Sequence, residues 1–200
     1  MSLDFRHIRD RLVMAALPHV VFDGWSARTL AEAARDEGMD ATMPARAFPG
    51  GAVEAVEHFI DMADRVMLAD LAELDLAAMR IPDRVFAAVK LRLERWGHHR
   101  EAVRRAMAVM ALNPLAATRA TLRTVDAIWH AVGDASHDFS WYTKRATLAA
   151  VYSATVLYWL EDPTDDFSDT WAFLRRRLAD VGRVTRTRRK VEEMVARRGR

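Results

Sequence analysis

The sequence contains no cysteine, and glycine and proline are scarce, at 8 and 6 of 200 residues. Without cysteine the chain forms neither disulfides nor thiolate metal sites. Because glycine and proline interrupt helices, their scarcity alongside abundant alanine, leucine and arginine favours helix almost throughout. No strand-like alternation of useful length and no repeat of fixed period is found. The length predicts one all-α domain of ordinary size with a hydrophobic core.

Long hydrophobic runs are missing as well. The uncharged segment of residues 146–160 has fifteen residues, whereas a helix that spans a bilayer takes about twenty. We therefore interpret this segment as a central core helix. The first residues, Met1 to His7, contain no apolar signal core, so we expect no targeting segment and a cytoplasmic protein.

Signatures of catalysis and metal binding are absent too. None of the seven histidines is preceded at three residues by glutamate, so the Glu-x-x-His pattern of di-iron helical bundles is missing. The chain also has no Gly-rich phosphate loop and no Gly-x-Ser-x-Gly elbow. We predict no metal site, no cofactor and no catalysis by this chain alone.

The net charge of +2 hides an asymmetry. Residues 183–200 contain eight basic and two acidic residues, which leaves the rest of the chain at about −4. A basic segment of this kind suits the phosphates of nucleic acid or of lipid headgroups. In helical projection, Val184, Val191, Met194 and Val195 share one side, and cations occupy much of the rest. The pattern fits either a solvated terminal helix or a helix on a membrane surface.

Turn-forming residues divide the chain into roughly nine or ten helices. The expected segments are about 4–20, 27–36, a short helix ending at Phe48, 51 to about 79, 82–96, one up to 112, one from 114 to 132, the apolar helix ending before 162, and 166–181.

The first three segments have the order helix, loop with Trp25, helix, glycine turn, short helix and Phe-Pro-Gly-Gly. This layout resembles the helix-turn-helix head of tetracycline-repressor-like regulators. A recognition helix needs several donors aimed at base edges. Residues 41–48 contain Pro44 and only one long polar side chain, Arg46. We therefore expect a degenerate head without DNA binding.

Residues 138–145 read Asp-Phe-Ser-Trp-Tyr-Thr-Lys-Arg and directly precede the apolar segment. Trp141 and Arg145 are four residues apart, as are Asp138 and Tyr142, so each pair shares a helix face. Such a cluster is consistent with capping and cation–π contact, and equally with a partner-docking hot spot.

Longer motifs add a family resemblance. Residues 130–152, His-Ala-Val-Gly-Asp-Ala-Ser-His-Asp-Phe-Ser-Trp-Tyr-Thr-Lys-Arg-Ala-Thr-Leu-Ala-Ala-Val-Tyr, closely resemble the signature of the ubiquinone-biosynthesis lipid-binding accessory family. So do residues 166–174, Asp-Phe-Ser-Asp-Thr-Trp-Ala-Phe-Leu. The likeness covers about residues 5–182. It implies a tetracycline-repressor-like fold with a degenerate helix-turn-helix head (1–50), a lipid-binding helical body (51–182) and a basic amphipathic tail (183–200).

The resemblance also implies a function and a set of residues. Proteins of this family present ubiquinone precursors to the di-iron demethoxyubiquinone hydroxylase without catalysis of their own, and the ligand is an isoprenoid quinone or a phospholipid. The family's partner surface corresponds here to Gly133, Asp134, Asp138, Trp141, Tyr142 and Arg145. The residues expected to line the lipid cavity are Trp129, Trp141, Leu148, Val151 and Tyr152.

In a lipid-delivering family the tail is expected to lie on an anionic membrane surface, peripheral at its inner face. The expected contacts are Arg186, Arg188, Arg189, Lys190, Arg197 and Arg198. A second copy of the chain is kept as a further candidate partner. The alternative function is a ligand-responsive, repressor-like transcriptional regulator, which the poor third helix disfavours.

Overall fold

The helices follow one another with short connections. The computed structural model describes the backbone of residues 2–133 and 139–198 and the side chains of residues 5–133 and 141–183. Over these residues it contains nine α-helices, two short 3₁₀ helices and no strand. The α-helices are α1 (Ser2–Asp23), α2 (Ala27–Asp36), α3 (Met43–Ala47), α4 (Gly51–Ala72), α5 (Ile81–Glu94), α6 (Arg100–Ala111), α7 (Pro114–Ala131), α8 (Phe139–Glu161) and α9 (Ser168–Arg198). The all-α prediction is confirmed.

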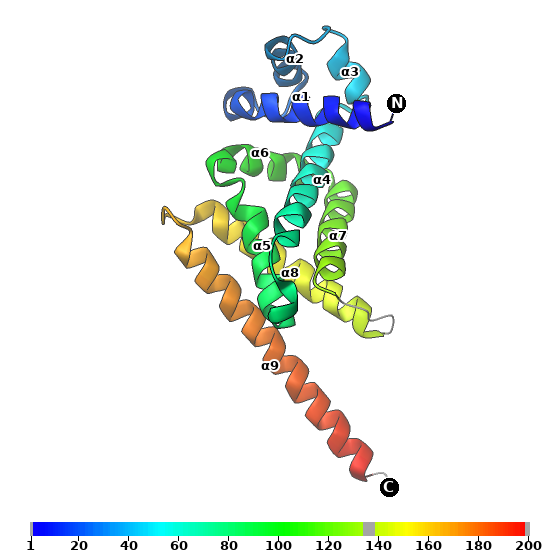
Figure 1. The fold of residues 1–200 in the computed structure, drawn as a ribbon, viewed down its shortest axis with the longest axis vertical. Coiled ribbons are helices and arrows are strands. Elements are labelled where there is room, and N and C mark those ends of the chain that lie inside the picture. Colours follow the sequence, from blue (N-terminus) through cyan, green and yellow to red (C-terminus); the bar gives the residue numbers. More distant parts are fainter. Residues whose placement is uncertain (1, 134–138, 199–200) are drawn as a thin grey trace.

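Figure 1 shows α1, α2 and α3 grouped at one end, with α4 running from this head into the body. In the body α5, α6 and α7 pack against α4, and α8 and α9 pack against α5, against each other and, for α8, against α7. The C-terminal half of α9 leaves the body (Figure 1). Two ends differ from expectation. The fourth helix ends at Ala72, and a 3₁₀ helix over Leu76–Ala78 follows, capped by Asp75. The last helix does not end at Val181, and its backbone continues to Arg198.

The ends of the other helices follow local chemistry. Ser26 caps α2, since its hydroxyl accepts a hydrogen bond from the Thr29 N–H at 3.1 Å. Gly38 has a φ of 61° and closes the turn after α2. Pro82 and Pro114 lie in the first turns of α5 and α7, where no N–H donor is needed.

The start of α9 depends on one carboxylate. Asp162 accepts hydrogen bonds from the backbone N–H groups of Thr164 (2.9 Å) and Thr170 (2.8 Å). Burial alone would raise the pKa of Asp162, but the bonds from Thr164 and Thr170 outweigh it and hold that pKa below its usual value. The chain therefore turns from α8 into α9 around a carboxylate that stays ionised.

Polar and aromatic contacts join the head to the body. The indole N–H of Trp25 donates to the Ala102 carbonyl on α6 at 3.0 Å, and the Trp25 ring lies 5.5 Å from that of Phe59 on α4. On the other side of α1, Asp10 bonds to His58 (2.7 Å) and Arg65 (2.6 Å) of α4. The head is thus fixed to the helix that enters the body.

Candidate functional site: a buried cavity and a surface patch

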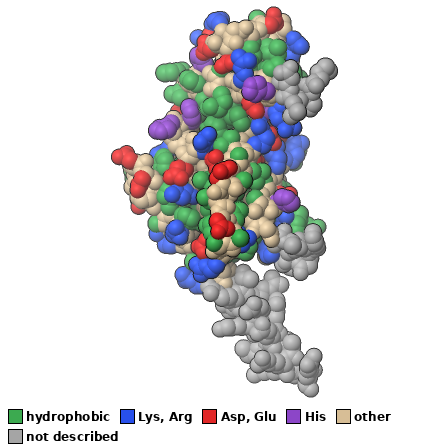
Figure 2. All heavy atoms as spheres, viewed as in Figure 1, with side chains coloured by type: hydrophobic (Ala, Val, Ile, Leu, Met, Phe, Trp, Pro, Cys, Tyr) green, Lys and Arg blue, Asp and Glu red, His purple; other side chains and the backbone are tan. Residues whose placement is uncertain are grey.

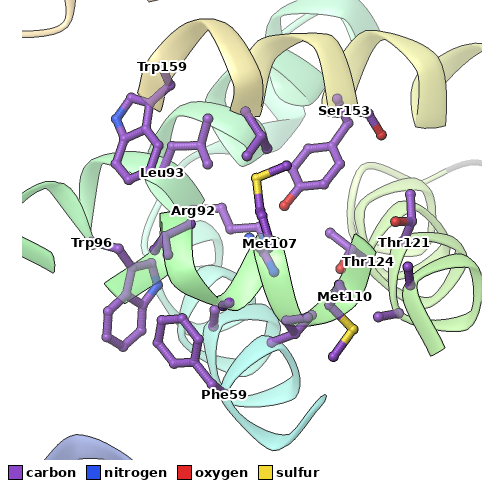
Figure 3. Close-up of a pocket in the computed structure, with 18 of the residues that line it drawn as sticks. Phe59, Arg92, Leu93, Trp96, Met107, Met110, Thr121, Thr124, Ser153 and Trp159 are labelled. Carbon is purple, nitrogen blue, oxygen red and sulfur yellow. The ribbon is translucent and has the colours of Figure 1, made fainter. Parts of the chain in front are cut away.

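Five helices of the body, α4 to α8, enclose a cavity of about 290 Å³ (Figure 3). At ~30 Å³ per molecule of liquid water, this is space for roughly ten waters. Most of the wall is apolar and comes from Phe59, Ile60, Ala63, Leu93, Trp96, Val103, Ala106, Met107, Met110, Ala111, Ala117, Ala120, Val156 and Trp159. The polar lining residues are Arg92, Thr121, Thr124, Tyr152 and Ser153. Such a cavity suits a largely apolar ligand with a few polar atoms.

The polar part of the wall is built around a buried ion pair. Arg92 on α5 donates from Nε to Oδ1 of Asp64 on α4 at 2.8 Å, and both side chains are less than a tenth exposed. The hydroxyl of Thr124 on α7 donates to the same carboxylate at 2.9 Å. The Asp64 carboxylate is therefore held by groups from two other helices, which satisfies the requirement that a buried charge be paired and hydrogen-bonded.

Tyr152 on α8 lies beside this pair. The centre of the Arg92 guanidinium is 5.4 Å from the centroid of the Tyr152 ring. Burial raises the pKa of Tyr152 above its usual value, and the nearby Arg92 only partly opposes this. At neutral pH the Tyr152 hydroxyl is therefore protonated and available as a hydrogen-bond donor in the wall of the cavity.

The cavity reaches the surface, because two of its lining residues, Ala111 on α6 and Ser153 on α8, are exposed. Deeper in, the aromatic rings of Phe59 and Trp96 pack edge to face with centroids 4.9 Å apart. Figure 3 shows Trp159 and Leu93 at one end of the cavity and Met110 and Thr121 at the other. The flexible Met107 and Met110 side chains let such a wall adapt to ligands of different shape.

The residues predicted to bind lipid are placed as follows. Tyr152 lines the cavity. Leu148 and Val151 are buried in the hydrophobic core on the same helix but are not among the described lining residues. Trp129 on α7 is half-buried, and the Lys144 ammonium lies 5.7 Å from its ring centroid. The assignment of all five residues to lipid binding stays a prediction, and Tyr152 is the one among the four placed here that lines the cavity.

Trp141, the remaining member of that set, belongs to a surface cluster at the start of α8. We call Trp141, Tyr142 and Arg145, with Gly133, the α8 patch. The Arg145 guanidinium lies 3.9 Å from the Trp141 ring centroid, and the Trp141 and Tyr142 rings meet edge to face at 4.7 Å. The predicted pairing of Trp141 with Arg145 on one helix face is confirmed.

The patch is also joined to α7. Arg145 donates from Nε to Oδ1 of Asp126 at 2.8 Å. Tyr142 is 69 % exposed and so offers its ring to a partner. Gly133 closes α7 with a φ of 85°, a conformation that favours glycine. Asp134 and Asp138, the other two predicted partner-binding residues, lie outside the described residues.

The predicted membrane-contacting side chains, Arg186, Arg188, Arg189, Lys190, Arg197 and Arg198, also lie outside the described side chains. The backbone that carries them is helical, as part of α9. Among the described residues no helix is long and apolar enough to cross a bilayer. No cluster of three or more metal-ligating side chains is found in the same part of the chain.

Several cavity residues were not identified from the sequence. One of them, Arg92, and its buried partner Asp64 left a detectable signal. Asp64 lies on the same helix face as the buried Met67 and Leu71, at spacings of three and seven residues. Arg92 continues the buried series of Val85 and Val89 on α5 in the same way. A single acidic and a single basic residue on otherwise apolar helix faces predict a buried pair.

Comparison with known proteins shows which family the chain resembles. Residues 115–185 match the COQ9 family. The chain is 34 % identical over 194 residues to the human ubiquinone biosynthesis protein COQ9, mitochondrial, a match that covers 92 % of this chain and 61 % of the human protein. It is 31 % identical over 180 residues to the Drosophila melanogaster protein of that name, covering 87 % of this chain and 55 % of the relative. The chain thus spans about three fifths of the length of these curated relatives.

Among solved structures, a TetR transcriptional regulator from Nitrosomonas europaea superposes with a TM-score of 0.69 at 19 % identity, over 86 % of this chain and 96 % of the regulator. At that identity the likeness shows the fold alone, and it confirms the predicted tetracycline-repressor-like architecture. The predicted resemblance is confirmed as well: the chain carries the COQ9 family signature over residues 115–185 and is homologous to the COQ9 ubiquinone biosynthesis proteins over nearly its whole length.

Proposed function

We propose that this chain is a non-enzymatic lipid-binding protein of ubiquinone biosynthesis that presents an isoprenoid quinone precursor to the demethoxyubiquinone hydroxylase. The observation that carries the proposal is the cavity enclosed by α4 to α8, whose wall is mostly apolar. Burying each methylene of a ligand in such a cavity contributes about 0.8 kcal/mol. The names of the curated relatives supply the pathway.

The α8 patch supports the partner in this proposal. It presents one exposed tyrosine, one tryptophan and one arginine within a single turn of helix. These are the residue types enriched in the energetically dominant part of protein interfaces. The patch and part of the cavity wall belong to the same helix, α8, so a partner that binds the patch contacts an element that also touches the ligand.

The basic tail supports peripheral attachment at the inner face of a membrane. Each arginine or lysine near an anionic leaflet contributes about 1 kcal/mol, so the tail cations together outweigh the negative body. Deleting residues 183–200 is expected to abolish sedimentation with phosphatidylserine-containing vesicles, and raising the salt concentration is expected to weaken sedimentation of the full chain. The control is an unchanged melting temperature of the shortened chain. Equal sedimentation of both chains would show that the tail is not the anchor.

The lipid is tested on protein purified without detergent. Organic extraction and mass spectrometry are expected to release an isoprenoid quinone or a phospholipid. A quinone precursor supports the whole proposal, and a phospholipid supports the lipid site alone. Protein that releases no lipid and binds neither quinone nor phospholipid on addition would overturn the proposal.

A transcriptional regulator is the second candidate, because the fold is that of a TetR regulator. The charge of the head, residues 1–50, argues against a DNA-binding regulator. Residues 1–50 contain six arginines against seven acidic residues, and acidic and basic side chains are interspersed on the face of the head in Figure 2. Nonspecific DNA affinity depends on a cationic surface. Retention of the purified chain on genomic DNA at low salt would favour the regulator, and its absence the lipid-binding protein.

A further inference from the structure

Several hydrogen-bonding groups in the cavity wall lack a protein partner among the described residues, and the indole N–H groups of Trp96 and Trp159 are two of them. The Arg92 guanidinium and the Tyr152 hydroxyl are two more. Arg92 uses its Nε for Asp64, and its terminal nitrogens Nη1 and Nη2 make no hydrogen bond within that part of the chain. The Tyr152 hydroxyl makes none there either. Both side chains are more than nine-tenths buried. Buried donors are normally satisfied, so this end of the cavity is built to receive acceptor atoms from a bound molecule.

Figure 3 shows where the Arg92 donors point. The Arg92 side chain extends from α5 into the cavity beside Met107, with Thr124 on its other side. Since Arg92 and the protonated Tyr152 hydroxyl both donate, the matching ligand atoms are oxygens that accept hydrogen bonds. A hydrocarbon chain offers no such atoms and would leave the donors of both residues unsatisfied.

The charges around the site favour a neutral ligand over an anion. Asp64 pairs with Arg92 at 2.8 Å and lies 3.6 Å from Nε of Arg123. Arg123 in turn lies 4.0 Å from Asp61, which also pairs with Arg65, and Arg65 pairs with Asp10. Three arginines thus face three aspartates. A carboxylate or phosphate entering this balanced group would bring an unpaired charge into a buried site, which is costly.

The size and lining of the cavity restrict the class of ligand further. The volume of about 290 Å³ holds one substituted ring and a short length of chain, as it corresponds to roughly ten waters at ~30 Å³ each. Phe59, Trp96 and Trp159 supply aromatic surfaces for packing against such a ring. The rest of a polyprenyl chain would leave through an exposed part of the wall, at Ala111 on α6 or at Ser153 on α8.

We propose that the cavity is a head-group site: Arg92 and Tyr152 donate hydrogen bonds to the oxygen atoms of a neutral quinone or methoxyphenol ring, and the isoprenoid chain points to the surface. This inference rests on the proposed function for the pathway, but the geometry adds which end of the precursor is held inside. Arg92 and Tyr152 are then the residues that distinguish a ring-bearing isoprenoid from a plain isoprenoid or a fatty acid.

The test uses the full chain, isothermal titration calorimetry and three probes. These are a dimethoxy-methyl-benzoquinone without a chain, the isoprenoid hydrocarbon farnesene, and dodecanoate as an anion. Because the protein has no cysteine, thiol addition to the quinone does not interfere. The variant Tyr152→Phe removes only the hydroxyl. Its matched control is Tyr158→Phe, the same change on the same helix at a ring that stacks on Phe173 and is not a described lining residue.

The benzoquinone is expected to bind the wild type and to bind Tyr152→Phe about fivefold to tenfold more weakly, the loss of one hydrogen bond of about 1 kcal/mol. Farnesene affinity should not change, and Tyr158→Phe should bind both probes like the wild type. A second variant, Arg92→Lys, keeps the charge opposite Asp64 but removes guanidinium donors, and it should weaken benzoquinone binding with a native melting profile.

Three outcomes overturn the inference. In the first, benzoquinone fails to bind while farnesene binds, so the cavity holds the chain and the proposed function survives. In the second, Tyr152→Phe weakens both probes equally, which indicates a packing change. In the third, dodecanoate binds more tightly than benzoquinone and loses affinity in Tyr152→Phe, which indicates an anion site. If no probe binds and no lipid co-purifies, the proposed function itself fails.

Discussion

The cavity and the α8 patch each contain an arginine that lies over an aromatic ring and bonds to an aspartate on another helix. In the cavity Arg92 lies 5.4 Å from the Tyr152 ring and bonds to Asp64. In the patch Arg145 lies 3.9 Å from the Trp141 ring and bonds to Asp126. The two arginines are alike in burial, with side chains 8 % and 11 % exposed, and the aspartates differ: the Asp64 side chain is 6 % exposed and the Asp126 side chain 59 %.

The arginine, the aspartate and the aromatic ring have different roles in the two places because the aspartates differ in their exposure to water. In the patch water reaches the Asp126 end of the Arg145–Asp126 pair and screens it, so the pair contributes little to stability, and the exposed Tyr142 ring remains available to a partner. Inside the body the Arg92–Asp64 pair has lost its water, so each charge depends on the other. A buried ion pair is weak evidence for stability, and its position in a cavity wall with unused donors indicates a role in ligand recognition.

The largest expected effect comes from breaking the buried unit. Asp64→Ala should lower the free energy of unfolding by about 3–5 kcal/mol, because it leaves the Arg92 charge buried and unpaired. The matched change in the patch, Asp126→Ala, should cost about 0–1 kcal/mol. Urea denaturation of both variants measures the difference. Similar losses for the two would show that burial does not distinguish the pairs as argued.

The next effect concerns binding by the patch. Tyr142→Ala and Trp141→Ala should each weaken binding of the hydroxylase by about 2 kcal/mol, or roughly 30-fold, because interface aromatics dominate binding energy. Tyr158→Ala is the control, since it removes a partly exposed ring from the same helix outside the patch. Surface plasmon resonance measures the affinity and thermal melting the stability. A loss of several kcal/mol of folding stability in Trp141→Ala would instead identify this ring as part of the core.

The patch could be predicted from the sequence more completely than the cavity, because its residues are close together in the sequence and those of the cavity are far apart. Trp141, Tyr142 and Arg145 lie within one helical turn, so spacing alone brings them together. The cavity wall draws on five helices, and nothing in the local pattern places Phe59 beside Trp96. Helix class and most helix ends were predictable because Ser26, Pro82 and Pro114 act on their own neighbours.

The misplaced helix ends have the same origin. The last helix was predicted to end at Val181, just before Gly182, yet α9 continues past this glycine, since a single glycine in a helix costs only about 1 kcal/mol. Pro18 is likewise tolerated inside α1, a helix that packs against α2, α4 and α6. How much a helix tolerates such a residue depends on the packing of the whole helix, which neighbouring residues in the sequence do not show.

The smallest expected effect distinguishes the Arg92–Asp64 pair from the Arg145–Asp126 pair most directly, because it depends only on how strongly dissolved salt screens each pair. Asp126→Asn should destabilise the protein by about 0.5 kcal/mol at low ionic strength, and the loss should vanish near 1 M salt, where the Debye length is about 3 Å. Asp64→Asn should show a larger loss that salt leaves almost unchanged, since ions do not reach the buried Arg92–Asp64 pair. Thermal denaturation at several sodium chloride concentrations measures both slopes relative to the wild type. If the stability loss of the two variants changed with salt concentration in the same way, solvent would reach Asp64. The polar part of the cavity wall would then be hydrated.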